Sequence, residues 1–247
     1  MDDERFRQEQ ARFFEAADTS HFFWQTRNPY FSRTERALLE GFPEAAGRVV
    51  LDLGCGEGGN LVNLFGGSPS QPRLIVGLDL FPRKLAFASA QFARGRFVCG
   101  DAGTLPFADA AFDLVLCRDL LHHLEDREPA LRELARVLRP GGRLFLVEPN
   151  GRNPLIALLA LVRPHERGQL QTTPRTMRTL TQRHFHEVTV EVRQPLPVYR
   201  ALLHYQFGLP RLGAARAFGI LMDAWEGLWQ VVMPRPWWAY IVVRATR

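Results

Sequence analysis

Short apolar runs and amphipathic stretches alternate regularly along the middle of the chain. Apolar runs that end in glycine or acidic residues are typical of buried β-strands. They occupy residues 49–54, 73–80, 96–101, 112–119 and 142–149. The stretches between them predict helices over residues 59–65, 83–93 and 128–138. This alternation predicts a mostly parallel sheet with both faces covered, which binds its ligands at the carboxyl ends of the strands.

The pattern changes on either side of this region. The first 45 residues are rich in aromatic side chains and predict helices. After Pro149, the spacing predicts a helix over residues 173–185 with Thr173 as its N-cap, a half-exposed strand over residues 187–192 and a closing strand over residues 238–244.

Two insertions interrupt this second part, at residues 150–172 and 195–235. The second insertion carries apolar side chains at helical spacing, which predict an amphipathic helix with one buried face. They are Ala214, Phe218, Leu221, Trp225, Leu228 and Val232. We interpret residues 1–247 as a single domain, with an N-terminal helical lid (1–45), a core (46–149) and a cap made by the two insertions.

Composition narrows the class of protein. Of the 247 residues, 46% are hydrophobic and 23% are charged, as in ordinary globular proteins. The apolar run at residues 154–162 is about half as long as a bilayer crossing requires, and the polar, acidic start does not resemble a signal peptide. Three cysteines without a CxxC pair or a Cys/His cluster argue against a disulfide framework and against a metal site. A cytoplasmic protein is the expectation.

Charge is distributed unevenly between the two parts of the chain. Residues 1–150 carry a net charge of −3, whereas residues 151–247 carry +8, from 13 arginines and 5 acidic residues. A basic, aromatic-rich part could face a membrane surface, a nucleic acid or an anionic substrate, or it could simply be a solvated surface. Lys84 is the only lysine in the chain, so the excess of arginine also reflects a compositional bias.

A glycine-rich loop follows the first strand. Its sequence, LDLGCGEGG at residues 51–59, satisfies the GxGxxG pattern and opens a helix whose N-terminal N–H groups can face a ligand. Asp79 ends the next strand, where a carboxylate can accept hydrogen bonds from both ribose hydroxyls. These features fit either a dinucleotide or S-adenosylmethionine, and the loop alone could also be a structural turn.

The full series of motifs resembles the class I S-adenosylmethionine-dependent methyltransferases, in the group that includes ubiquinone and menaquinone methyltransferases. The resemblance covers residues 49–149 and consists of VVLDLGCGEGG, GLDL, CGDAGTLPFADAAFDLVLCRDLLHHL and LRELARVLRPGGRLFLVEP in this order. It implies a Rossmann-like, seven-stranded, mostly parallel sheet whose last strand is antiparallel. Helices would cover both faces, and the cofactor would be S-adenosyl-L-methionine.

The resemblance also implies which residues contact this cofactor. Asp52 would hold the ammonium group, Asp79 the ribose diol and Asp101 the adenine amino group, although an Asp in a GDAG sequence also suits a turn. The whole implied set consists of Asp52, Gly54, Cys55, Gly56, Asp79, Leu80, Asp101, Ala102 and Cys117.

Catalytic candidates follow the fourth strand. Methyl transfer to an unactivated hydroxyl needs a base, and His122 and His123 are expected at the cofactor. One of them could instead be a packing or cofactor-side residue. No metal is expected.

The acceptor should contact segments outside the shared core. The candidates, which could equally be packing residues, are Trp24, Arg27, Tyr30, Arg118, Tyr199 and Tyr205. The same aromatic segments include His21, Phe22 and Phe207.

These residues predict methylation of a small, hydrophobic acceptor, with oxygen as the expected atom. The alternative is a peripheral membrane methyltransferase that acts on a lipid or quinone at carbon or oxygen. A non-catalytic scaffold is disfavoured because every expected cofactor contact is present. A nucleic-acid substrate is disfavoured because the chain shows no RNA-binding module. The oligomeric state is not predicted.

Overall fold

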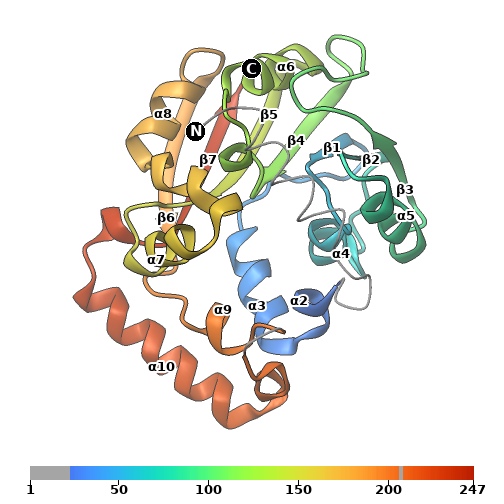
Figure 1. Cartoon of the computed structure of the whole chain (residues 1–247). Helices are drawn as coiled ribbons and strands as arrows, with labels where there is room; N and C mark the ends of the chain where they lie inside the picture. Colours follow the sequence, from blue (N-terminus) through green and yellow to red (C-terminus); the bar gives the residue numbers. More distant parts are fainter. Residues whose placement is uncertain (1–22, 206–207) are drawn as a thin grey trace.

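A single seven-stranded sheet forms the centre of the fold. The computed structural model describes residues 23–205 and 208–247 (Figure 1). The strands run in the spatial order β3-β2-β1-β4-β5-β7-β6. All pairs are parallel except those of β7, which is antiparallel to β5 and β6. Their bounds are β1 Val49–Leu53, β2 Leu74–Asp79, β3 Gly95–Cys99, β4 Phe112–Arg118, β5 Leu138–Pro149, β6 His186–Arg193 and β7 Tyr240–Thr246. The predicted sheet is therefore confirmed.

The strand order changes direction between β1 and β4. From β1 the chain passes outward to β2 and β3 and then returns to β4 on the other side of β1. Leu53 pairs with both Leu78 and Cys117, so three strands end together at this edge. Diverging connections leave a crevice at such a point, and the glycine loop begins there.

Helices cover both faces of the sheet because the strand side chains are apolar on both sides. On one face, α6 (Glu128–Val137) and α8 (Pro174–Thr181) pack on a cluster that contains Leu51 and Val115. On the other face, α3 (Pro29–Leu38) and α4 (Gly59–Phe65) pack on Val50, Leu114 and Phe145. Helix α5 (Pro82–Gln91) lies beside β2 and β3.

Three predicted helix ends are wrong. The helix expected over residues 83–93 ends at Gln91. The helix expected over residues 173–185 ends at Thr181, because the chain turns there to bury Phe185 in the core before β6. The helix expected over residues 128–138 ends at Val137, because Leu138 already pairs with Phe112 as the start of β5. Gly141 has a left-handed φ of 75°, and the register of the β4–β5 pairing shifts between Phe112 and Leu114.

The insertions form a helical cap over the carboxyl ends of the strands. They contain α7 (Pro154–Val162), η3 (Pro164–Gln171), α9 (Tyr199–Leu202), η4 (Pro210–Ala214), α10 (Arg216–Val232) and η5 (Arg235–Trp237). The N-terminal helices α2 (Trp24–Arg27) and α3 lie against α9 and α10, at the bottom of the view in Figure 1.

The predicted buried face of α10 is wrong in part. Phe218 and Met222 are its buried side chains, in a cluster with Tyr30 and Tyr199, whereas Leu221 is 62% exposed. Leu228 and Val232, which were also expected on the buried face, are 57% and 59% exposed. In the part of the chain that the structure describes, no helix is both long and apolar enough to cross a bilayer.

Candidate active site

Three glycines with a left-handed backbone conformation shape the loop after β1. Gly54, Gly56 and Gly58 have φ values of 73°, 50° and 83°, which residues with a Cβ adopt only under strain. The backbone N–H groups of Gly54 and Cys55 donate to the carbonyl of Leu78 at 2.8 and 3.0 Å. A Cβ on Gly56 would meet nothing within 4 Å, so the loop backbone borders open space.

Asp79 is fixed at the rim of this space. Its carboxylate accepts hydrogen bonds from the backbone N–H of Gly56 at 2.8 Å and of Phe81 at 3.0 Å. The side chain is 8% exposed, so its remaining lone pairs can face a ligand. This placement suits the ribose-binding role that the resemblance implies.

Asp52 is an isolated buried acid. It is fully buried, and its Oδ1 accepts only a long hydrogen bond of 3.4 Å from Asn60. Its Oδ2 has no hydrogen-bond partner among the described residues. Burial raises the pKa of Asp52 to about 7, against the smaller opposing effects of Asn60 and Arg118. The unpartnered Oδ2 is compatible with the ammonium-binding role that the resemblance implies.

A cavity of about 870 Å³ opens in front of these groups. Most of the implied cofactor residues line it: Gly54, Cys55, Gly56, Asp79, Leu80, Asp101 and Ala102. Asp52 and Cys117 do not, because both side chains are fully buried behind the wall. Cys117 packs in the core. Asp101 is exposed and also accepts from the backbone N–H of Gly103 at 2.6 Å, as a turn-forming Asp does.

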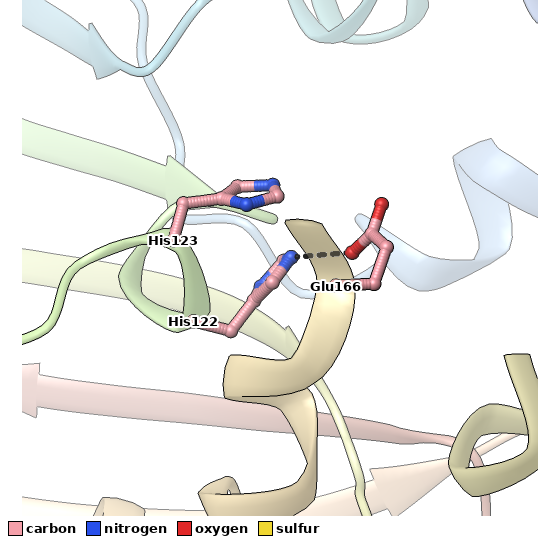
Figure 2. A group of neighbouring side chains, drawn as sticks. All are labelled: His122, His123 and Glu166. Carbon is pink, nitrogen blue, oxygen red and sulfur yellow. Dashed lines mark ion pairs between the residues drawn. The ribbon is translucent and has the colours of Figure 1, made fainter. Parts of the chain in front are cut away.

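Of the two predicted histidines, His123 lines this cavity and His122 does not, and their surroundings differ strongly. The buried carboxylate of Glu148 accepts from the backbone N–H of Leu120 and Leu121 and lies 2.7 Å from Nδ1 of His122. Nε2 of the same ring lies 3.2 Å from Oε2 of Glu166, which comes from η3 (Figure 2). His122 therefore lies between two carboxylates.

This placement separates the protonation states of the two rings. Burial alone would lower the pKa of His122, but the charges and hydrogen bonds of Glu148 and Glu166 raise it to about 10. Burial lowers the pKa of His123 to about 3, with a further contribution from the positive charge on His122. At neutral pH, His122 is an imidazolium that donates to both carboxylates, and His123 is neutral.

The same side chains are also the ones most able to share a metal ion. Among the described residues, the donor atoms of His122, His123 and Glu166 lie within 4.8 Å of one another. However, the imidazolium of His122 has no lone pair to offer, and a cation would have to displace a proton that two carboxylates hold. We interpret the cluster as a charge network, and the absence of a metal stays a prediction.

A smaller cavity of about 220 Å³ adjoins the first one, and both are lined by Trp24, His123 and Glu166. Its apolar wall comes from Ile156 and Leu159 of α7. The polar wall includes Arg163, Arg200 and His204. All three segments outside the core thus contribute to the space next to the histidines.

Only some of the predicted acceptor-binding residues line a cavity. Trp24 lines both cavities, and Arg118 lines the larger one as part of a buried ion pair with Glu35. The others line neither cavity in the described chain: Arg27 is exposed, Tyr30 and Tyr199 are buried under α10, and Tyr205 stacks on His204. His21, Phe22 and Phe207 lie outside the described residues.

Two important acids were missed in the sequence. Glu148 is a charged residue that directly follows the apolar run of residues 144–147 at the end of β5. This position was a usable signal because a buried acid needs a partner. Glu166 had no such signal, since it lies in an insertion without a motif. The buried pairing of Glu35 with Arg200 at 3.2 Å joins α3 to α9 and was not visible either.

Comparisons with known proteins agree with this geometry. Residues 51–146 match a family described as a methyltransferase domain. A relative, 27-O-demethylrifamycin SV methyltransferase of Amycolatopsis mediterranei, is 31% identical over 136 residues, which are 51% of this chain and 49% of the relative. The demethylmenaquinone methyltransferase of Thermus thermophilus is 42% identical over 120 residues, 47% of this chain and 54% of the relative. The chain spans about half the length of these curated relatives.

The fold has solved counterparts over nearly the whole chain. Phosphoethanolamine N-methyltransferase 2 of Haemonchus contortus, solved with S-adenosyl-L-methionine, has a TM-score of 0.69 at 21% identity. The match covers 98% of this chain and 60% of that protein. The motif series, the sheet order and the matched family lead to one conclusion: residues 51–146 carry a methyltransferase domain, in a fold shared with solved S-adenosylmethionine-dependent methyltransferases.

Proposed function

We propose that this chain transfers a methyl group from S-adenosylmethionine to a hydroxyl oxygen of a small, largely apolar molecule. The observation that carries the proposal is the junction of the two cavities at His123. The larger cavity is bordered by the glycine loop and Asp79, and the smaller one has apolar walls from α7. A neutral imidazole thus lies between a cofactor site and an acceptor site.

His123 is the base in this proposal. When bound, S-adenosylmethionine supplies an electrophilic methyl group on a sulfonium that becomes a neutral thioether once the methyl leaves. The acceptor O–H donates a hydrogen bond to a ring nitrogen of His123, which takes the proton as the oxygen–carbon bond forms. His122 cannot fill this role, because both of its ring nitrogens are protonated and face carboxylates. Glu166 lies on the same side and offsets the charge that His123 gains.

The test combines cofactor binding with label transfer. Calorimetry should show that S-adenosylhomocysteine binds and NAD does not. Transfer from methyl-labelled S-adenosylmethionine should then occur to members of a panel of phenols and apolar alcohols. His123→Ala should lower turnover by about 10- to 10²-fold and leave the affinity for S-adenosylhomocysteine nearly unchanged. The effect is at the low end of general base catalysis because the pKa of His123 lies far below the working pH. NAD binding alone would refute the family-based function, and transfer only to amines or carbon would refute the oxygen assignment.

The pH profile gives a second check. An ordinary imidazole would lose activity as a base below about pH 6. Because the pKa of His123 is lowered to about 3, we expect turnover to stay level well below pH 6. A fall in turnover centred near pH 6.5 in the wild type would contradict this assignment.

A membrane-resident lipid or quinone is a second candidate acceptor, and helix α7 favours it. Ile156 and Leu159 of this helix line the smaller cavity, while Leu158, Leu161 and Val162 on its other side are 59–69% exposed. An apolar acceptor could therefore pass from an apolar surface into the site over a short distance.

A further inference from the structure

Helix α10 has an apolar face that the rest of the described chain leaves uncovered. Five large side chains on it are exposed by 57–87%: Ile220, Leu221, Leu228, Val231 and Val232. At about 100° per residue, they fall in one arc of about 120°, which also contains Ala217 and Ala224. The polar residues of the helix lie outside this arc, in a strip that contains Arg216, Asp223, Glu226 and Gln230.

A helix with this pattern is unusual on a surface exposed to water. Its other side is already buried through Phe218 and Met222, so the uncovered arc is not the face that holds the helix to the protein. Asp223 fixes the orientation, because it pairs with Arg33 of α3 at 2.6 Å. Such large contiguous apolar patches mark interaction sites.

The arc continues onto neighbouring parts of the cap. Further exposed apolar side chains are Leu158, Leu161 and Val162 of α7, Leu202 of α9, and Leu209 and Leu212 at η4. Asn153, the N-cap of α7, donates to the carbonyl of Trp237 at 2.9 Å, just beyond the end of α10. At the C-terminal end of α7, a guanidinium nitrogen of Arg163 lies 3.4 Å from Nε2 of His204, which follows α9. We call the exposed apolar residues of α7, α9, η4 and α10 the cap surface; these helices lie on the same side of the molecule in Figure 1.

The charges around the cap surface are almost all positive. The two insertions expose five arginines, Arg152, Arg167, Arg211, Arg216 and Arg235. Among their described residues, Asp223 is the one exposed acid, and its charge is already matched by Arg33. An apolar helix face bordered by arginines is complementary to an anionic lipid surface, where acyl chains meet phosphate groups.

We propose that the cap surface docks the chain on an anionic lipid bilayer, with α10 lying in the plane of the interface. Helix α7 would then have one side in the membrane boundary and the other on the smaller cavity, so that an apolar acceptor could enter from the lipid. Only this acceptor route rests on the proposed function; the docking itself does not. A second copy of the chain is a less suitable occupant, because a symmetric contact would bring the same arginines together.

The experiment is vesicle sedimentation with the full chain. Vesicles of phosphatidylcholine with one part in three of phosphatidylglycerol should bind the wild type, and pure phosphatidylcholine vesicles should bind it less. Leu228→Asp with Val231→Asp should reduce binding at least about tenfold, because two exposed anchors are lost and two negative charges are added. The matched control is Ser89→Asp with Gln91→Asp, which adds the same charges at exposed positions of α5 and should bind as the wild type does.

Several results would overturn the proposal. One is a wild type that stays in the supernatant with phosphatidylglycerol vesicles, and another is a cap variant that binds as well as the wild type. A third is a wild-type dimer that the cap variant converts to monomer without any vesicle binding, which would make a second copy the occupant. Circular dichroism and S-adenosylhomocysteine affinity should be unchanged in both variants. A wild type that transfers methyl groups but does not bind vesicles refutes only the docking, and a wild type that binds vesicles but does not transfer methyl groups refutes only the proposed function.

Discussion

The buried carboxylate of Asp52 should make the ligand-free protein less stable while it strengthens cofactor binding. Burial raises its pKa from 3.8 to about 7. A group whose pKa is higher in the folded state contributes most to the free energy of unfolding below its unfolded pKa. That contribution is lost as the pH rises towards 7. About three pKa units at about 1.4 kcal/mol each give at most about 4 kcal/mol above pH 7.

Asp52→Asn tests both effects with one change of nearly constant shape. The amide keeps an oxygen for Asn60 and removes the buried charge. We therefore expect the free energy of unfolding of the ligand-free variant at pH 8 to exceed that of the wild type by about 1–3 kcal/mol, with a higher melting temperature. The two proteins should converge near pH 4. Affinity for S-adenosylhomocysteine should fall by about 10- to 100-fold, the scale of a hydrogen bond to a charged group.

Thermal denaturation at pH 4, 6 and 8 and calorimetry near neutral pH would measure the two effects. Asp113→Asn is the control, because its carboxylate accepts from the backbone N–H of Val49 and pairs with Arg139 at 2.5 Å. Those contacts outweigh burial and lower the pKa of Asp113, so this variant should lose stability at pH 8 and keep its affinity. A less stable Asp52→Asn protein, or one that binds S-adenosylhomocysteine as the wild type does, would refute the reasoning.

Three further predictions follow from buried groups. A maleimide should modify Cys99 rapidly in the folded protein, with one adduct by mass, because Cys55 and Cys117 are buried and burial raises the pKa of both thiols. Glu35→Gln should lower the free energy of unfolding in urea by about 3–5 kcal/mol, since two buried arginines lose their carboxylate. In His122→Gln, the rate of label transfer should begin to fall at a higher pH than in the wild type. The reason is that the positive charge that lowers the pKa of His123 is removed.

The core of the fold could be predicted because its signals are local. Every expected strand exists, and the helix predicted over residues 59–65 is observed as Gly59–Phe65. Helix ends were less predictable where a long-range contact competes with helical spacing, as at Leu138 and Phe185. The buried face of α10 failed for a related reason: its apolar residues extend so far around the helix that the sequence does not distinguish the face that packs from the face that is exposed.

The acceptor side was predicted poorly because its residues have no shared motif. Aromatic side chains in the lid and cap were expected to contact the acceptor, yet Tyr30 and Tyr199 pack against each other with ring centroids 5.4 Å apart. Arg200 and Glu35, which determine how α9 lies against α3, are 165 positions apart in sequence. Composition placed the right types of residue in these segments, but only the packing decides which of them face the cavity.

The histidine pair shows why a motif could suggest two bases without choosing between them. In the sequence, His122 and His123 are neighbours of the same type. The difference between them comes from Glu148, which ends β5, and Glu166, which belongs to an insertion. Because these acids hold a proton on His122, the charge that results also keeps His123 unprotonated. Glu166→Gln should lower the pKa of both imidazoles, because the charge of Glu166 raises the pKa of His122 and also that of His123. Titration of the two imidazoles by NMR would measure both shifts, and unchanged values would show that Glu148 alone maintains the pair.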